Sequence, residues 1–144
     1  FENTFIQYRI TKDLDKAVWK KLIINSIVNP FSVIFRAKNK VIADNIQCEL
    51  KDALLKEGRA VARSEGYNIS LSVSDVNSFI RSDNRTSMLQ DYFKKKPNEI
   101  DYINGSIVSI GEKNGVNVST NKLIFSIVKN IEMCRLHDLE ESSI

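Results

Sequence analysis

Three polar side chains at a regular spacing lie within the most apolar segment of this 144-residue chain. Lys21, Asn25 and Asn29 follow one another at intervals of four residues within Trp19–Phe35, where most other positions are apolar. On an α-helix this spacing places all three on one face. Such a stripe usually marks a face in contact with water, but asparagine is a poor helix former and two of them one turn apart are an unusual choice for that purpose. A groove with two amides and one ammonium instead suits a small anionic or carbonyl-bearing ligand, to which Lys21 could donate a proton.

A second candidate for ligand binding lies near Ser87. This serine follows Asn84-Arg85-Thr86 and is predicted to be the N-cap of a helix. The free backbone N–H groups of a helix N-terminus bind anions such as carboxylates, but a serine that only caps its helix explains the same pattern. Farther along, Glu99 and Asp101 begin the next predicted helix, where acidic side chains complement the helix dipole without any ligand.

The elements that position these residues are predicted to be helices. Apolar residues recur at helical spacing along most of the chain. About six helices are expected, over 14–35, 43–65, a short stretch around Val76–Ile80, 87–95, 99–113 and 119–141. The first contains Pro30, which removes one backbone hydrogen bond. On the last, Leu123, Ile127 and Ile131 are predicted to face the core. Residues 1–12 are predicted as a linker or a short strand, and the remainder as an all-α domain.

Composition and charge argue against several classes of protein. The net charge is only +3 and the basic residues are scattered, which is not typical of a nucleic-acid binder. No apolar stretch approaches the length of a membrane span and no signal-peptide pattern is present, so a cytoplasmic protein is expected. Cys48 and Cys134 cannot by themselves form a disulfide framework or a four-ligand zinc site, and no metal site is predicted. None of the five glycines forms a G-x-G-x-x-G turn, so any nucleotide phosphate would be bound by another part of a longer protein.

Three motifs, read in order, resemble a known family. They are W-x-K-x-x-x-N-x-x-x-N-P at 19–30, S-M-L-Q-D at 87–91 and N-E-I-D-Y-I-N-G at 98–105. Together they resemble the C-terminal domain of ketopantoate reductase (2-dehydropantoate 2-reductase), over about Ala17 to Glu132. The resemblance implies a helical fold similar to the 6-phosphogluconate dehydrogenase C-terminal domain. Residues 13–144 would form this domain, and residues 1–12 would connect it to a missing N-terminal Rossmann domain.

The same resemblance implies a reaction and its partners. The Rossmann domain of such an enzyme binds NADPH, and the helical domain closes over it, with the substrate between the two. The enzyme reduces the C2 ketone of ketopantoate to pantoate, on the route to pantothenate and coenzyme A. The chain alone is therefore expected to be inactive, and a homodimer is a further expected association.

Site roles carry over residue by residue. Lys21 matches the catalytic lysine of the family, which donates a proton to the alkoxide at C2, whereas Lys20 does not fit that register. Asn25 and Asn29 match asparagines that hydrogen-bond the hydroxyl and carbonyl oxygens of the substrate.

The resemblance implies roles for four further residues. Asn39 matches another substrate-side asparagine, although the family usually has glycine where this chain has Lys40. Ser87 matches the group that holds the substrate carboxylate, with Asn84 beside it. Glu99 matches a catalytic glutamate that reaches the cofactor and can position the lysine ammonium.

Two other interpretations remain open from the sequence. One is a related reductase that acts on a different 2-oxo acid or ketone. The other is a non-enzymatic helical module that uses its apolar faces for dimerisation. An upstream segment with a strand followed by a glycine-rich turn would favour the enzyme.

Overall fold

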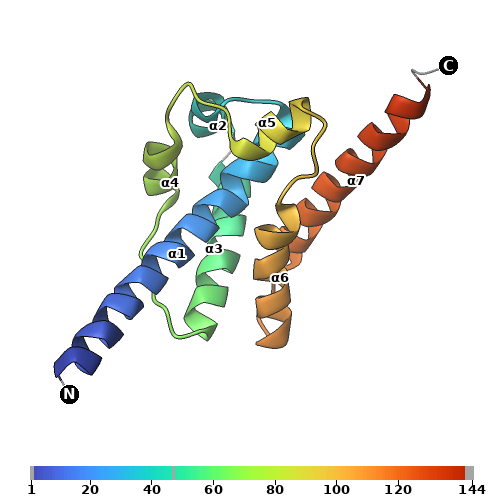
Figure 1. Cartoon of the computed structure of the whole chain (residues 1–144). Helices are drawn as coiled ribbons and strands as arrows, with labels where there is room; N and C mark the ends of the chain where they lie inside the picture. The colour runs from blue at the N-terminus through green and yellow to red at the C-terminus, as the bar shows by residue number, and fades with distance from the viewer. Residues whose placement is uncertain (1, 47, 142–144) are drawn as a thin grey trace.

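The computed structural model describes the backbone of residues 2–46 and 48–141, and the side chains of 14–46 and 48–137. Over these residues the chain is helical and has no strand, which confirms the predicted all-α class. Seven α-helices and one 3-10 helix follow one another along this part of the chain (Figure 1). They are α1 (Glu2–Phe35), α2 (Asn39–Asn45), α3 (Cys48–Ser64), α4 (Val73–Ile80), α5 (Ser87–Phe93), η1 (Ile100–Tyr102), α6 (Asn104–Lys113) and α7 (Ser119–Glu141).

Two predicted helices are divided in the structure. The segment 43–65 becomes α2 and α3, because the backbone turns to an extended conformation at Ile46. The segment 99–113 becomes η1 and α6, with the break at Ile103, where φ is −103° and ψ is −90°. Residues 2–12 belong to α1, where the sequence predicts a linker or a short strand. Extending a helix that has already formed costs far less than starting one, so the β-favouring residues here do not end it.

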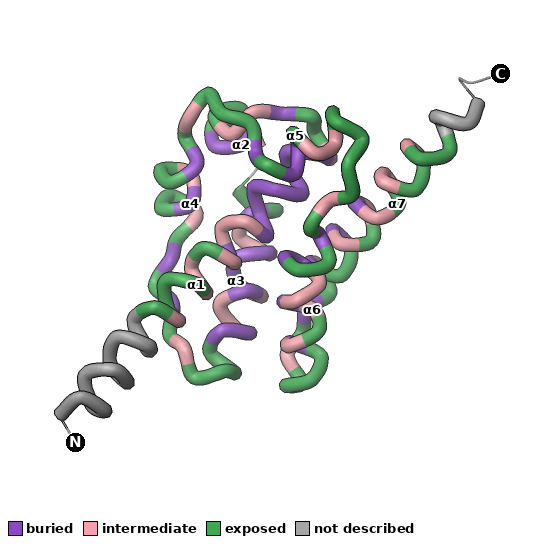
Figure 2. Tube along the Cα trace, in the orientation of Figure 1, coloured by how far each residue is buried: buried purple, intermediate pink, exposed green. Residues whose placement is uncertain are grey.

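Helix α1 is the element against which the others assemble. It packs on α3, α5, α7 and α2, and its C-terminal half holds the longest buried run among the residues whose side chains the structure describes (Figure 2). Ile23, Ile27 and Phe31 are fully buried there and belong to one core cluster with Leu54 and Leu55 of α3. Burial of these side chains, each giving about 1.5–3 kcal/mol, fixes which face of α1 points inward. No helix among the described residues is long and apolar enough to cross a membrane.

Candidate functional site

A cleft of about 610 Å³ lies along the face of α1 that the core leaves free. Its volume is within the range of about 300–1,000 Å³ that is typical of small-molecule sites. Four segments form its walls: α1, the start of α2, the end of α4 and the start of α5. The lining residues are Ala17, Lys20, Lys21, Ile24, Asn25, Val28, Asn29, Asn39, Phe79, Ile80, Thr86 and Ser87.

The predicted polar stripe of α1 lines this cleft. Lys21, Asn25 and Asn29 all contribute to the wall. Exposure falls along the stripe: Lys21 is exposed, Asn25 is intermediate and Asn29 is buried, with 6% of its surface accessible. The ammonium therefore lies at the open edge of the cleft, and the Asn29 amide lies deep inside it.

Asn39 reaches the cleft from the first turn of α2, where a loop before α5 holds it. The backbone N–H of Asn39 donates to the Asn84 carbonyl at 3.0 Å, and that of Lys40 donates to the Ser82 carbonyl at 2.8 Å. The side-chain oxygen Oδ1 of Asn39 is buried and has no hydrogen-bond partner among the described residues. A buried acceptor without a donor is costly, and a ligand in the cleft could supply one.

Ser87 lines the cleft, but it is not the N-cap of α5 that the sequence predicts. The cap is Thr86, whose Oγ1 accepts a hydrogen bond from the Leu89 backbone N–H at 3.0 Å. Thr86 is buried, and its hydroxyl also bonds Ser32 Oγ of α1 at 2.5 Å. That pair joins α5 to α1, and since Thr86 does the capping, the Ser87 hydroxyl is not needed for it.

Two predicted site residues do not line the cleft. Asn84 is exposed and contributes its backbone carbonyl, which holds Asn39. Glu99 is exposed, at the start of η1, and borders a small crevice that is also bounded by Asn29 and Ser87. The structure thus places Glu99 next to two cleft residues but outside the cleft itself.

Lys20 and Phe79 are cleft residues that the sequence did not identify. The Lys20 ammonium lies 4.5 Å from the centroid of the Phe79 ring, a cation–π contact between α1 and α4. No acidic side chain is found among the described residues that line the cleft, which two lysines therefore make positive. This charge favours an anionic ligand. Lys20 directly precedes Lys21, so doubled basic residues were the available signal.

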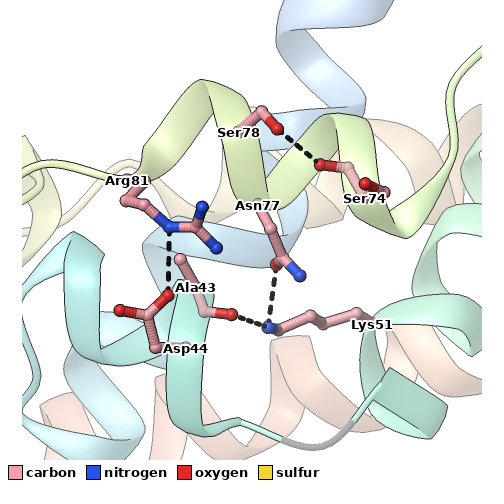
Figure 3. A network of polar contacts seen from close by, with 7 residues as sticks. All are labelled: Ala43, Asp44, Lys51, Ser74, Asn77, Ser78 and Arg81. Atoms are coloured by element: carbon pink, nitrogen blue, oxygen red, sulfur yellow. Dashed lines mark hydrogen bonds and ion pairs between the residues drawn. The ribbon is translucent and has the colours of Figure 1, made fainter.

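A buried lysine links α2 and α4, the two short helices that contribute Asn39 and Phe79 to the cleft (Figure 3). The Lys51 ammonium, fully buried on α3, donates to the Ala43 carbonyl at 3.1 Å and to Asn77 Oδ1 at 2.9 Å. Ala43 is in the last turn of α2, where carbonyls lack helical partners and a cation is favourable. Asn77 belongs to α4, and Arg81 beyond that helix pairs with Asp44 at 3.0 Å. These contacts join the two short helices that carry the Asn39 and Phe79 walls.

No group of three or more His, Cys, Asp or Glu side chains that could hold a metal ion is present among the described residues. Cys48 and Cys134 are both exposed free thiols.

The comparison with known proteins agrees with the motifs. The family model for the C-terminal domain of ketopantoate reductase PanE/ApbA matches residues 13–132. The 2-dehydropantoate 2-reductase of Archaeoglobus fulgidus is 33% identical over 123 residues, which cover 83% of this chain and 42% of the relative. This chain thus spans less than half the length of that protein.

Solved structures share the fold. A PanE/ApbA family ketopantoate reductase from Ralstonia eutropha JMP134 superposes with a TM-score of 0.74 at 30% identity, over 84% of this chain and 42% of the other. A D-mandelate dehydrogenase in a ternary structure with NADH and anilino(oxo)acetate superposes with a TM-score of 0.75 at 23% identity, over 83% of this chain and 41% of the other. At that identity the second likeness concerns the fold alone.

Lys51 predicts a pH dependence of stability. Burial lowers the pKa of the Lys51 ammonium, opposed in part by Cys48 and Asp44. As the pH rises between this lowered pKa and the ordinary value of about 10.4, the unfolded chain binds more protons, so the free energy of unfolding increases. In thermal unfolding, the free energy of unfolding of the wild type should therefore increase relative to that of Lys51→Met as the pH is raised from 7 to 10.

Lys56→Met is the matched control, because Lys56 lies on the same helix and is well exposed. Its difference from the wild type should stay nearly constant over the same pH range. A Lys51→Met difference that also stays constant would contradict the assigned burial effect.

Proposed function

The chain belongs to the ketopantoate reductase C-terminal family, and from that membership we propose that it is the substrate-binding and catalytic domain of an NADPH-dependent 2-dehydropantoate 2-reductase. Such an enzyme reduces ketopantoate to pantoate, which leads to pantothenate and coenzyme A. One observation carries the proposal: Lys21, Asn25, Asn29 and Ser87, which come from two motifs far apart in sequence, line a single cleft. That cleft is positive and suits a keto acid with one carboxylate.

Lys21 is the proton donor in this proposal. When the C2 carbonyl is reduced, its oxygen becomes an alkoxide, and an ammonium beside it stabilises that charge more in the transition state than in the ground state. The Lys21 Nζ then gives a proton to the oxygen and completes the alcohol. Its place at the open edge of the cleft puts it where a second domain and its contents would meet the substrate.

The amides and the serine orient the substrate. Asn25 and Asn29 present hydrogen-bonding groups along one wall, deeper than Lys21. Ser87, opposite them on α5, offers a hydroxyl for the carboxylate, and Asn39 offers an acceptor for the substrate hydroxyl. Fixed orientation of this kind lowers the entropy cost of reaching the transition state.

NADPH, when bound, would supply the hydride. The open side of a positive cleft suits an anionic dinucleotide, while the chain lacks a glycine-rich turn for its phosphates. We therefore assign most of its binding to the protein's own N-terminal Rossmann domain, a partner that would cover the cleft and exclude water. Glu99, beside Asn29 and Ser87, would face this partner and help to position the Lys21 ammonium.

The fold alone does not fix the substrate, since a D-mandelate dehydrogenase shares it. A reductase for another 2-oxo acid is accordingly the second candidate, and the apolar wall of Phe79 and Ile80 is the part of the cleft that would accept a different side chain.

We place either reaction in the reducing cytoplasm, where the free thiols of Cys48 and Cys134 would persist. A homodimer would use exposed apolar residues of α7 such as Met133 and Leu136.

Replacing the proton donor tests the mechanism. In the intact gene product, Lys21→Ala should lower kcat for ketopantoate reduction by about 10²–10⁴-fold, as expected for the loss of a positioned general acid. NADPH oxidation, followed by absorbance, measures this directly. Lys40→Ala, an exposed lysine that does not line the cleft, is the control and should keep its turnover. A Lys21→Ala enzyme with most of its activity would remove this lysine from the mechanism.

The role of Asn29 is tested by a different kinetic constant. Because its buried amide would orient the substrate without giving up a proton, Asn29→Ala should mainly raise the KM for ketopantoate, by about tenfold for one lost hydrogen bond of about 1.4 kcal/mol. Steady-state kinetics over a range of ketopantoate concentrations provide the measurement. An unchanged KM would mean that the stripe does not touch the substrate at this position.

A further inference from the structure

A buried carbonyl in the middle of α1 lacks its normal helical partner. In an α-helix the carbonyl of residue i bonds the N–H of residue i+4. The partner of Ser26 would be residue 30, which is proline and has no N–H. Ser26 is fully buried, so water cannot replace the missing donor. Such a group needs another hydrogen bond from within the protein.

Asn104, the first residue of α6, supplies that hydrogen bond. Its Nδ2 donates to the Ser26 carbonyl at 2.9 Å and to Asn121 Oδ1 at 3.1 Å. Both partners are acceptors, so the NH₂ end of the Asn104 carboxamide, and not its oxygen, bonds them. Asn104 and Asn121 are fully buried. A polar side chain placed so deep in the core indicates a specific task.

The contact continues into a network that joins four helices. Asn121 Nδ2 donates to Glu57 Oε2 at 2.8 Å. The Glu57 carboxylate on α3 also accepts the backbone N–H groups of Thr120 and Asn121, at 2.8 and 2.9 Å, in the first turn of α7. The network therefore links α1 to α6, α7 and α3. None of its side chains lines the cleft.

We propose that Asn104 is a positioning residue for the reaction proposed above. Its amide replaces the hydrogen bond that Pro30 removes, and so fixes the turn of α1 between Asn25 and Asn29. Lys21 and Asn25 precede that turn and Asn29 follows it, yet all three must meet one small ligand.

Apolar packing alone would not fix this turn. Ile23 and Ile27 hold α1 in the core, but such contacts have no preferred direction. A helix that lacks one backbone hydrogen bond can bend at that point. The hydrogen bond from Asn104 is directional and therefore opposes such bending. The inference about catalysis rests on the proposed function, whereas the inference about α1 does not.

A double-mutant cycle in the intact gene product tests the proposal. The variants are Asn104→Leu, Pro30→Ala and the pair, with Leu71→Ala as a control that opens a cavity in the core. Leucine is close in size to asparagine but cannot donate, and the Pro30→Ala substitution restores an N–H to the Ser26 carbonyl. Three experiments are made: the unfolding midpoint, the hydrogen exchange of the α1 amides from residue 19 to residue 29, and steady-state kinetics (kcat and KM) for ketopantoate with NADPH.

The proposal predicts coupling in all three measurements. Asn104→Leu should lower kcat by about 10–100-fold, since a misplacement of the α1 side chains by about 1 Å is enough for such a loss. It should also speed the hydrogen exchange of the α1 amides at temperatures well below the unfolding midpoint. In the Pro30→Ala background both effects should shrink several-fold, and Asn104→Leu should cost less stability there than it does in the wild type. Leu71→Ala should lower the unfolding midpoint with kcat nearly unchanged.

Additive stability effects, or α1 exchange that Asn104→Leu does not alter, would overturn the proposal. An Asn104→Leu enzyme with faster α1 exchange but the kcat of the wild type would also overturn it, because Asn104 would then stabilise α1 without affecting catalysis. If the unmodified protein failed to reduce ketopantoate, only the proposed function would be contradicted. The double-mutant cycle on stability and the hydrogen exchange would still decide whether Asn104 fixes α1.

Discussion

The missing N–H of Pro30 is the constraint around which the domain is arranged. Proline stands in the helix that also carries Lys21, Asn25 and Asn29, and it leaves the Ser26 carbonyl unpaired in the core. The rest of the fold brings a donor to that point: the first residue of α6, backed by α7 and α3. The polar face of α1 is thus held by hydrogen bonds as well as by the apolar packing of its opposite face.

The other walls of the cleft are fixed in a similar way, by polar contacts behind them. Ser32 and Thr86 join α1 to the start of α5, while the Lys51 ammonium joins α2 to α4 (Figure 3). Apart from Thr86, the residues that make these contacts do not line the cleft, so Lys21, Asn25 and Ser87 remain available to a ligand. The consequence is a preformed groove that Lys20 and Lys21 make positive, with Asn29 buried and Lys21 exposed.

Much of the site could be predicted from the helical periodicity of one sequence segment. The spacing of Lys21, Asn25 and Asn29 needed only the 3.6-residue turn, and the structure places all three on the cleft. Asn104 appeared in a motif, but its task depends on the proximity of α6 to Pro30, which sequence spacing does not show. Lys20 and Phe79 were missed for the same reason, because their contact depends on how α4 packs beside α1.

Helix ends and faces were harder to predict. The breaks at Ile46 and Ile103 occur at residues without a glycine or proline signal. On α7, the prediction that Leu123 faces the core was wrong: it is 61% exposed, whereas Ile124 and Val128 are buried. Two apolar stripes run side by side there, and packing against α6, α1 and α3 selects between them. Thr86 replaced Ser87 as a cap because its hydroxyl can also reach Ser32.

The central claim is that this cleft recognises a 2-oxo acid through its negative charge. The most direct test compares reduction of ketopantoate with reduction of its uncharged primary amide, which keeps the hydroxyl, by the intact gene product with NADPH. The account predicts a kcat/KM at least about 100-fold higher for the acid, since one hydrogen bond to a charged group contributes about 1.5–3 kcal/mol and the cleft offers several polar partners. Equal kcat/KM values for the two compounds would contradict it.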